Sequence, residues 1–178
     1  MHLLPCVEGH VVCCWADGLV AAYKRSQLFA LSLWTLQLSH RIACTCTCTN
    51  PAVIVAATVG GSCSVVSAAD GLVIRTFSLG PIVLMHMFLT SATSLVTATR
   101  DGRIMFFNVD GPVVCKDSLS LGCPLLHVSA SVDGLLSVVK SNGCVQLVDV
   151  FADDFALLDR GSVVCLKTAV MSVVAGEL

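Results

Sequence analysis

Three cysteines alternate with threonines in the segment "CTCTC", where they are Cys44, Cys46 and Cys48. Thiolates spaced in this way could bind a soft metal ion or take part in redox chemistry. On a strand, however, residues i and i+2 lie about 6.6–7 Å apart, which is too far for ligands that must converge about 2.3 Å from one zinc ion. We therefore expect a strand that buries three small apolar thiols, with a metal or redox role completed by other residues as the alternative.

Other combinations of reactive side chains lack the local sequence that catalysis requires. The chain contains no Gly-x-Ser-x-Gly elbow, no Gly-x-x-x-x-Gly-Lys-Ser/Thr phosphate loop and no His-Glu-x-x-His motif. Cys13 and Cys14 are adjacent in an expected strand and would point to opposite faces. Asp153-Asp154, the only adjacent carboxylate pair, fits a solvated loop. We predict no catalytic residue, no cofactor and no metal, and hence no enzymatic activity.

Composition is typical of one domain, residues 1–178, with 12% charged and 56% hydrophobic residues. The net charge is −2 and the Lys and Arg residues are scattered, so we expect no binding to nucleic acid. The N-terminus has no basic segment of a secretory signal, and the eleven cysteines are an odd number. These features favour a reducing, cytoplasmic location.

Two long uncharged runs, residues 42–69 and 77–99, raise the alternative of an integral membrane protein. These runs contain threonine, asparagine, proline and glycine residues. Such residues would break a membrane-spanning helix and place polar groups on its surface. We therefore expect no membrane association.

Tight-turn signals recur along the chain at 17–18, 60–61, 101–102 and 142–143. The turns "WADG", "TVGG", "TRDG" and "KSNG" end at glycines that are 43, 41 and 41 residues apart. Short runs of small and β-branched residues flank each turn, which predicts a repeated hairpin whose two central residues have positive φ. An apolar residue follows each glycine by two positions: Val20, Cys63, Ile104 and Val145.

Four short strands in about 41 residues resemble the blade of the WD40 repeat family. The resemblance spans essentially the whole chain but is degenerate. The pairs in place of the family's Trp-Asp are Tyr23-Lys24, Val66-Ser67, Phe107-Asn108 and Val148-Asp149. The pairs in place of its Gly-His are Ser39-His40, Gly80-Pro81 and Gly122-Cys123. The family's polar network of His, strand hydroxyl, turn Asp and Trp is complete in no blade. A Kelch-type propeller, whose repeat is nearer 50 residues, is the related alternative.

The resemblance implies an all-β fold, a β-propeller of four-stranded antiparallel blades, and a non-catalytic scaffold for protein–protein interaction. Partner binding in the family most often uses the face formed by the turns between second and third strands and by the segments that enter each first strand. The corresponding residues here are His40, Arg41, Arg100, Asp101, Lys140 and Asn142.

Histidines recur in the expected first strands. His2, His86 and His127 each lie 16 residues before a turn glycine, and Thr45 occupies that position in the second unit. By the same count, Cys44 corresponds to Met85 and Leu126. The histidines could form a partial ring in a central channel and bind a metal ion or small molecule, or they could contact only backbone and water.

The two ends of the chain also follow the repeat. Met1 falls within the expected first strand of the first unit, and "MSVVAGEL" resembles "LSVVKSNG" from the fourth. We expect about four blades plus a fragment of a fifth, as part of a larger propeller. Closure as a small ring, association with another chain, and a truncated product without independent function are the alternatives.

Overall fold

The computed structural model describes residues 2–5, 9–27, 31–49, 52–91, 93–109, 111–130, 135–149 and 157–158. Apart from a 3₁₀ turn over Arg25–Gln27, the regular elements of these residues are β-strands. The strands form four antiparallel sheets, called blades 1 to 4 below, each with four strands in chain order. This confirms the predicted all-β fold and the four predicted repeats.

Each blade comprises four consecutive strands. Blade 1 contains β1 (His2–Pro5), β2 (His10–Cys14), β3 (Leu19–Lys24) and β4 (Ser32–Gln37). Blade 2 contains β5 (Ile42–Thr49), β6 (Ala52–Thr58), β7 (Ser62–Ser67) and β8 (Val73–Ser78). Blade 3 contains β9 (Leu84–Ser91), β10 (Ser94–Thr99), β11 (Arg103–Asn108) and β12 (Val114–Ser120). Blade 4 contains β13 (Leu125–Ala130), β14 (Leu135–Lys140), β15 (Val145–Asp149) and β16 (Leu157–Leu158).

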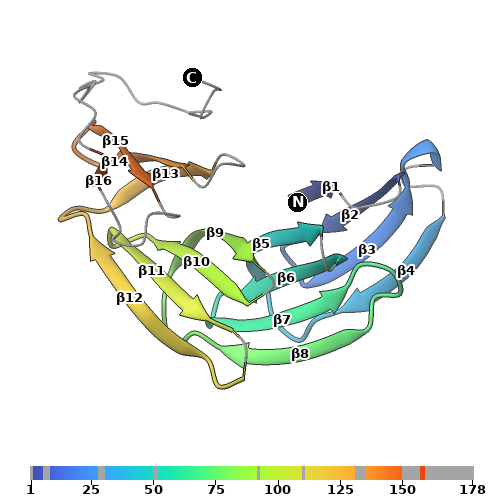
Figure 1. Ribbon diagram of the computed structural model, residues 1–178. Coiled ribbons are helices and arrows are strands. Elements are labelled where there is room, and N and C mark those ends of the chain that lie inside the picture. The colour runs from blue at the N-terminus through green and yellow to red at the C-terminus, as the bar shows by residue number, and fades with distance from the viewer. Residues whose placement is uncertain are drawn as a thin grey trace.

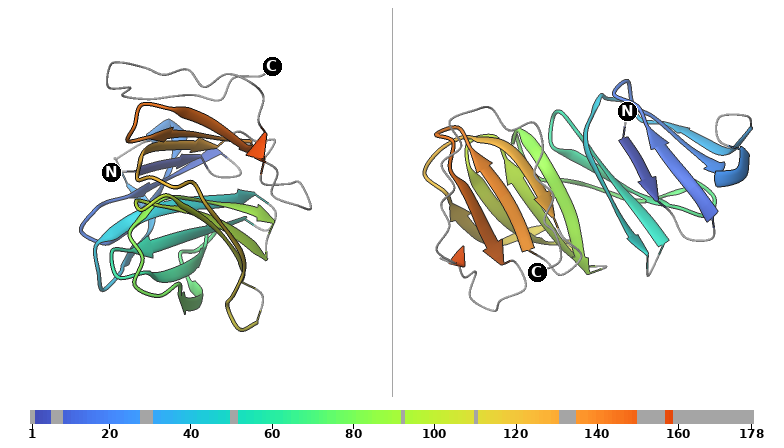
Figure 2. Two further views of the ribbon diagram at one scale, coloured as in Figure 1. Left: turned by 90° about the vertical axis from the view of Figure 1, so that its left-hand side faces the viewer. Right: turned by 90° about the horizontal axis from the view of Figure 1, so that it is seen from above.

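The blades follow one another along an arc (Figures 1 and 2), with blade 1 at one end and blade 4 at the other. The first strands β5 and β9 lie on the inner side of the arc, and β4, β8 and β12 run along its outer side (Figure 1). The predicted fragment of a fifth unit falls outside the described residues.

The turn between the second and third strands of each blade depends on its glycine. The Gly61 and Gly102 N–H groups donate to the carbonyls of Thr58 and Thr99, at 2.9 and 3.1 Å, so each glycine follows the two central turn residues. The glycines have φ of 78° and 94°. Our assignment of positive φ to both central residues was therefore wrong about the turn type, because a three-residue loop places the positive φ on the residue after them.

These glycines also allow another segment to approach closely. A Cβ on Gly61 would lie 1.9 Å from the Gly80 carbonyl oxygen, and a Cβ on Gly102 would lie 2.1 Å from that of Cys123. The Gly61 carbonyl also accepts a hydrogen bond from the Leu79 N–H at 2.9 Å. Glycine at these two positions therefore allows the turn to pack directly against the segment that enters the next blade.

The core consists of three apolar clusters, one between each pair of neighbouring blades. Val20, Cys63 and Ile104, the residues two positions after the turn glycines, are each 0% exposed and belong to successive clusters. Their blades thus contribute the same repeat position to the face turned toward the next blade. Val145 of blade 4 holds the equivalent position and is only half-buried.

Side-chain hydrogen bonds also tie neighbouring blades together, and they recur one repeat apart. The Trp34 indole N–H of β4 donates to the Ala68 carbonyl of blade 2 at 3.2 Å. The Arg75 guanidinium of β8 donates to the carbonyls of Val109 and Gly111 in blade 3. Both connections bridge 34 residues, from Trp34 to Ala68 and from Arg75 to Val109. The outer strand of one blade thus holds the turn between third and fourth strands of the next.

Candidate partner-binding face

One face of the arc is formed by the turns between second and third strands and by the segments that enter the first strands; we call it the turn face. The Val59 N–H donates to the Arg41 carbonyl at 3.0 Å, which joins the entry segment of blade 2 to its turn. The Arg100 N–H donates to the Val83 carbonyl at 2.9 Å in blade 3, and the Ser141 N–H donates to the Pro124 carbonyl at 2.8 Å in blade 4. Entry segment and turn are therefore adjacent in these three blades.

The six predicted partner-binding residues lie in these segments. His40 and Arg41 are exposed in the segment between β4 and β5, and the His40 Nδ1 is 2.8 Å from the Ser39 hydroxyl. Arg100 and Asp101 are exposed in the turn between β10 and β11. Lys140 is half-buried, and Asn142 is exposed with its Oδ1 accepting the Cys144 N–H at 3.1 Å. Their role in binding stays a prediction.

A pocket of about 540 Å³ opens on this face in blade 3. Its lining comes from the entry segment of blade 3, its turn, the start of β11 and the entry segment of blade 4. The lining residues are Pro81, Ile82, Val83, Thr99, Arg100, Asp101, Arg103, Met105 and Pro124. The pocket therefore brings together Arg100 and Asp101 but none of the other four predicted residues.

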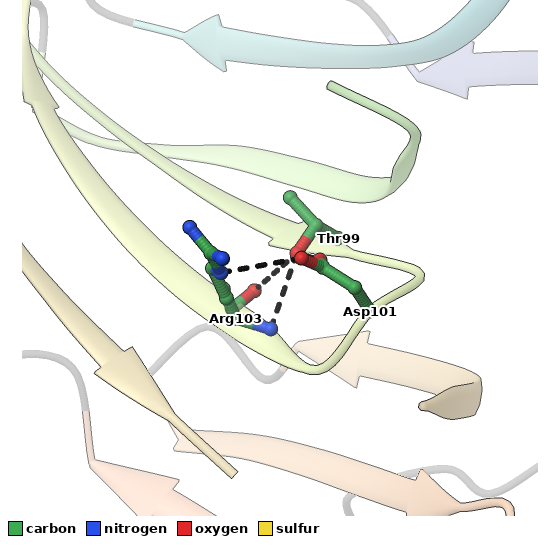
Figure 3. A network of polar contacts seen from close by, with 3 residues as sticks. All are labelled: Thr99, Asp101 and Arg103. Atoms are coloured by element: carbon green, nitrogen blue, oxygen red, sulfur yellow. Dashed lines mark hydrogen bonds and ion pairs between the residues drawn. The ribbon is translucent and has the colours of Figure 1, made fainter. Parts of the chain in front are cut away.

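Thr99, Asp101 and Arg103 form a polar network at the edge of the pocket (Figure 3). The Thr99 hydroxyl, on a side chain that is buried, donates to Asp101 Oδ1 at 2.5 Å and accepts the Arg103 backbone N–H at 3.1 Å. The Arg103 Nε is 3.2 Å from Asp101 Oδ2. The network fixes the turn and places an anionic and a cationic group side by side.

Cationic side chains predominate on the turn face. Its described charged residues are Arg41, Arg100, Arg103 and Lys140 against Asp17 and Asp101, which gives the face a charge of +2, whereas the whole chain has −2. Within the described part of the chain, the Arg100 guanidinium is in no ion pair. The turn face is therefore suited to an anionic partner.

Comparison with solved structures identifies the same architecture. The chain is similar to the β-propeller domain of Cps50 (Swd1) from Myceliophteria thermophila, with a TM-score of 0.67 and 12% identity over 83% of this chain and 50% of that one. It is also similar to BamB from Moraxella catarrhalis, with a TM-score of 0.62 and 13% identity over 83% of this chain and 45% of that one. The chain has a β-propeller fold.

The chain spans about half the length of these propellers. No protein-family model matches its sequence. No curated protein matches it either.

His86 and His127, the two described histidines of the proposed ring, do not converge on one site. His86 pairs with Ala98, on the face of blade 3 that packs against blade 4. His127 pairs with Val139, whereas the neighbouring pair Val128 and Val138 belongs to the cluster between blades 3 and 4. His127 thus lies on the far side of the blade 4 sheet from His86. The His2 side chain lies outside the described residues, and among those described no group of three His, Cys, Asp or Glu could hold a metal ion.

The strand register corrects the predicted equivalence of Thr45 with the histidines. A β-bulge lies between Ile42 and Cys44 in blade 2, one residue earlier relative to the turn glycine than the bulges of blades 3 and 4. Cys44 therefore pairs with Ala57 as His86 pairs with Ala98. Twelve residues separate Cys44 from Ala57, whereas eleven separate His86 from Ala98 and His127 from Val139. The hairpin between β5 and β6 is thus one residue longer, so counting back from the glycine misplaced the first strand of blade 2 by one position.

Cys44 and Cys46 are core residues of the propeller, as predicted. They are 4% and 6% exposed in the cluster between blades 2 and 3, whereas Cys48 is only half-buried. Burial raises the pKa of Cys44 to about 11 and that of Cys63 to about 12. Burial, followed by the neighbouring thiolates, raises the pKa of Cys46 further. Cys44, Cys46 and Cys63 are buried free thiols, which are protonated and unreactive at neutral pH.

The uncharged runs of the membrane alternative form strands rather than helices. Residues 42–69 supply β5, β6 and β7, and residues 77–99 supply all of β9 and β10. In the ranges that the structure describes, no helix has the length and apolar character to cross a membrane. Asp153-Asp154 lies outside those ranges.

Sequence reasoning missed part of the pocket. Arg103 directly follows the turn glycine, so the three charged residues of "TRDGR" were a signal that this turn differs from the others. The apolar part of the pocket, Ile82 and Val83, belongs to the uncharged run of residues 77–99. We analysed that run only for the secondary structure that it predicts.

Proposed function

We propose that this propeller segment is a non-catalytic scaffold that binds protein partners through its turn face in a reducing, cytoplasmic compartment. The observation that carries the proposal is the pocket on a cationic face whose backbone is fixed by hydrogen bonds between neighbouring segments. Loops held by a rigid framework are the usual location of recognition residues. The free thiols throughout the described residues support the reducing compartment.

Exposed apolar side chains add to the argument. Val59 and Val83 are each 63% exposed, and both lie on the turn face next to its cationic residues. Apolar contact area surrounded by charged groups is typical of protein-binding surfaces. A partner that covers these valines would remove them from water.

Site-specific crosslinking in cells tests this proposal. A photoreactive amino acid replaces Val83 on the turn face or, as the matched control, Val114 on the outer strand β12, which is 55% exposed. We expect a defined crosslinked product with another protein from position 83, absent from position 114 and lost when Arg100→Glu is added. Equal products from both positions, or none from position 83, would contradict the proposal.

A further inference from the structure

The pocket of about 540 Å³ beside Arg100 combines an apolar floor with one cation that has no ion-pair partner among the described residues. Ile82 and Met105 are largely covered and contribute apolar surface, and Val83 and Pro124 are exposed at its margin. A volume of this size is within the range of roughly 300–1,000 Å³ found for ligand sites. The pocket can therefore accept a large aliphatic side chain.

Arg100 is held in place from both sides through its backbone. Its N–H donates to the Val83 carbonyl at 2.9 Å, and its carbonyl accepts the Leu125 N–H of blade 4 at 3.0 Å. The base of the side chain is thus fixed by two blades. A group that is positioned before binding loses less entropy when its ligand arrives.

The two arginines of the pocket differ in their surroundings. Arg103 pairs with Asp101, and Thr99 holds that carboxylate at 2.5 Å, so the charges of Arg103 and Asp101 largely cancel. Arg100 then leaves the pocket with a net charge of about +1, which suits one carboxylate bound through two parallel N–H···O bonds. A dianionic phosphate is less well matched, because the Asp101 carboxylate at the same edge repels it.

We propose that this pocket binds a peptide segment of the partner in which an Asp or Glu adjoins a large aliphatic residue. The carboxylate pairs with Arg100, and the aliphatic side chain occupies the space between Ile82, Met105 and Pro124. This inference rests on the proposed function of the turn face and specifies the chemistry of its partner.

Selection from a random twelve-residue peptide library displayed on phage tests the inference on the full chain. We expect enriched peptides to contain Asp or Glu beside Leu, Ile or Met. Fluorescence anisotropy with the synthetic peptides should then show roughly tenfold weaker binding to Arg100→Glu, because the charge that pairs with the carboxylate is reversed. Arg100→Lys keeps the charge but not the two parallel N–H···O bonds, so its affinity should fall between those of the wild type and Arg100→Glu. Lys116→Glu on β12 should bind as the wild type does.

Several outcomes would overturn the inference: no enriched peptide, enriched peptides without acidic residues, a preference for phosphorylated over acidic versions of the peptides, or equal affinity for Arg100→Glu. Circular dichroism of each variant shows that a loss of binding does not reflect unfolding. If crosslinking from Val83 succeeds while the peptide prediction fails, the turn face binds a partner through other chemistry. If crosslinking also fails, the proposed function falls with it.

Discussion

The surfaces that pack between blades keep the same kind of residue from one repeat to the next, whereas the turn face does not. Between blades, one repeat position supplies Val20, Cys63 and Ile104, and all three are completely buried. On the turn face, the two central turn residues change from Val59-Gly60 to Arg100-Asp101 in consecutive blades. The repeated positions therefore determine how the blades pack, and the positions that vary give each blade a different surface.

The difference predicts that substitutions between blades or at the repeated turn glycines lower stability, whereas substitutions at the varying positions of the turn face alter binding. The largest loss is expected for Leu95→Ala, because Leu95 is 0% exposed in the cluster between blades 2 and 3. Its truncation should lower the free energy of unfolding by about 2–5 kcal/mol in urea denaturation. The control Leu126→Ala, at a residue that is 53% exposed, should change little. Equal losses would show that the blades are not packed as described.

Gly61→Ala should cost about 2–4 kcal/mol, because a Cβ clashes with the Gly80 carbonyl and the φ of 78° is unfavourable for alanine. Gly60→Ala is the matched control, since a Cβ there meets nothing within 4 Å. Thermal unfolding of the two variants compares adjacent glycines in one turn. A Gly60 variant as unstable as the Gly61 variant would refute this turn geometry.

Arg75→Gln should lower stability by about 1–3 kcal/mol, because the carbonyls of Val109 and Gly111 lose their guanidinium donor. Arg103→Gln removes an exposed ion pair, and we expect a change below about 1 kcal/mol in the same urea denaturation. The account of the link between blades 2 and 3 fails if the two variants are equally stable.

Alkaline pH should weaken the core between blades 2 and 3. The pKa values of Cys44 and Cys63 are raised from 9.0 to about 11 and 12, so their contribution to stability is complete below pH 9 and declines as pH rises toward those values. At pH 9 the loss should be about 0.4 kcal/mol for each thiol, because half of the unfolded-state thiols are then ionised. Urea denaturation at pH 7 and pH 9 measures it. A Cys44→Ala/Cys63→Ala variant that declines as steeply as the wild type would exclude these thiols as the cause.

The smallest effect on stability is expected for Arg100→Gln, within about 0.5 kcal/mol, because the side chain is exposed and forms no ion pair within the described residues. Thermal unfolding measures this value, and crosslinking from Val83 measures binding in parallel. A large loss of stability would assign Arg100 to the framework and not to recognition.

The sequence was sufficient to predict the blades but not the pocket. Strand composition and turn glycines such as Gly61 recur at a nearly fixed interval, which locates each hairpin without reference to other blades. The register of β5 could not be predicted, because nothing in the local sequence shows that the hairpin between β5 and β6 is one residue longer than those of blades 3 and 4. The pocket joins Val83, Arg103 and Pro124 across two blades, and only the packing of those blades brings them together.

The most direct test of this division compares Leu95→Ala and Arg100→Glu in the same two measurements, urea denaturation and crosslinking from position 83. The account predicts that Leu95→Ala unfolds at lower urea concentration yet still forms the crosslinked product under folding conditions. Arg100→Glu should unfold at the wild-type concentration and lose the product. An Arg100→Glu variant that retains the product, or that is as unstable as Leu95→Ala, would contradict the account.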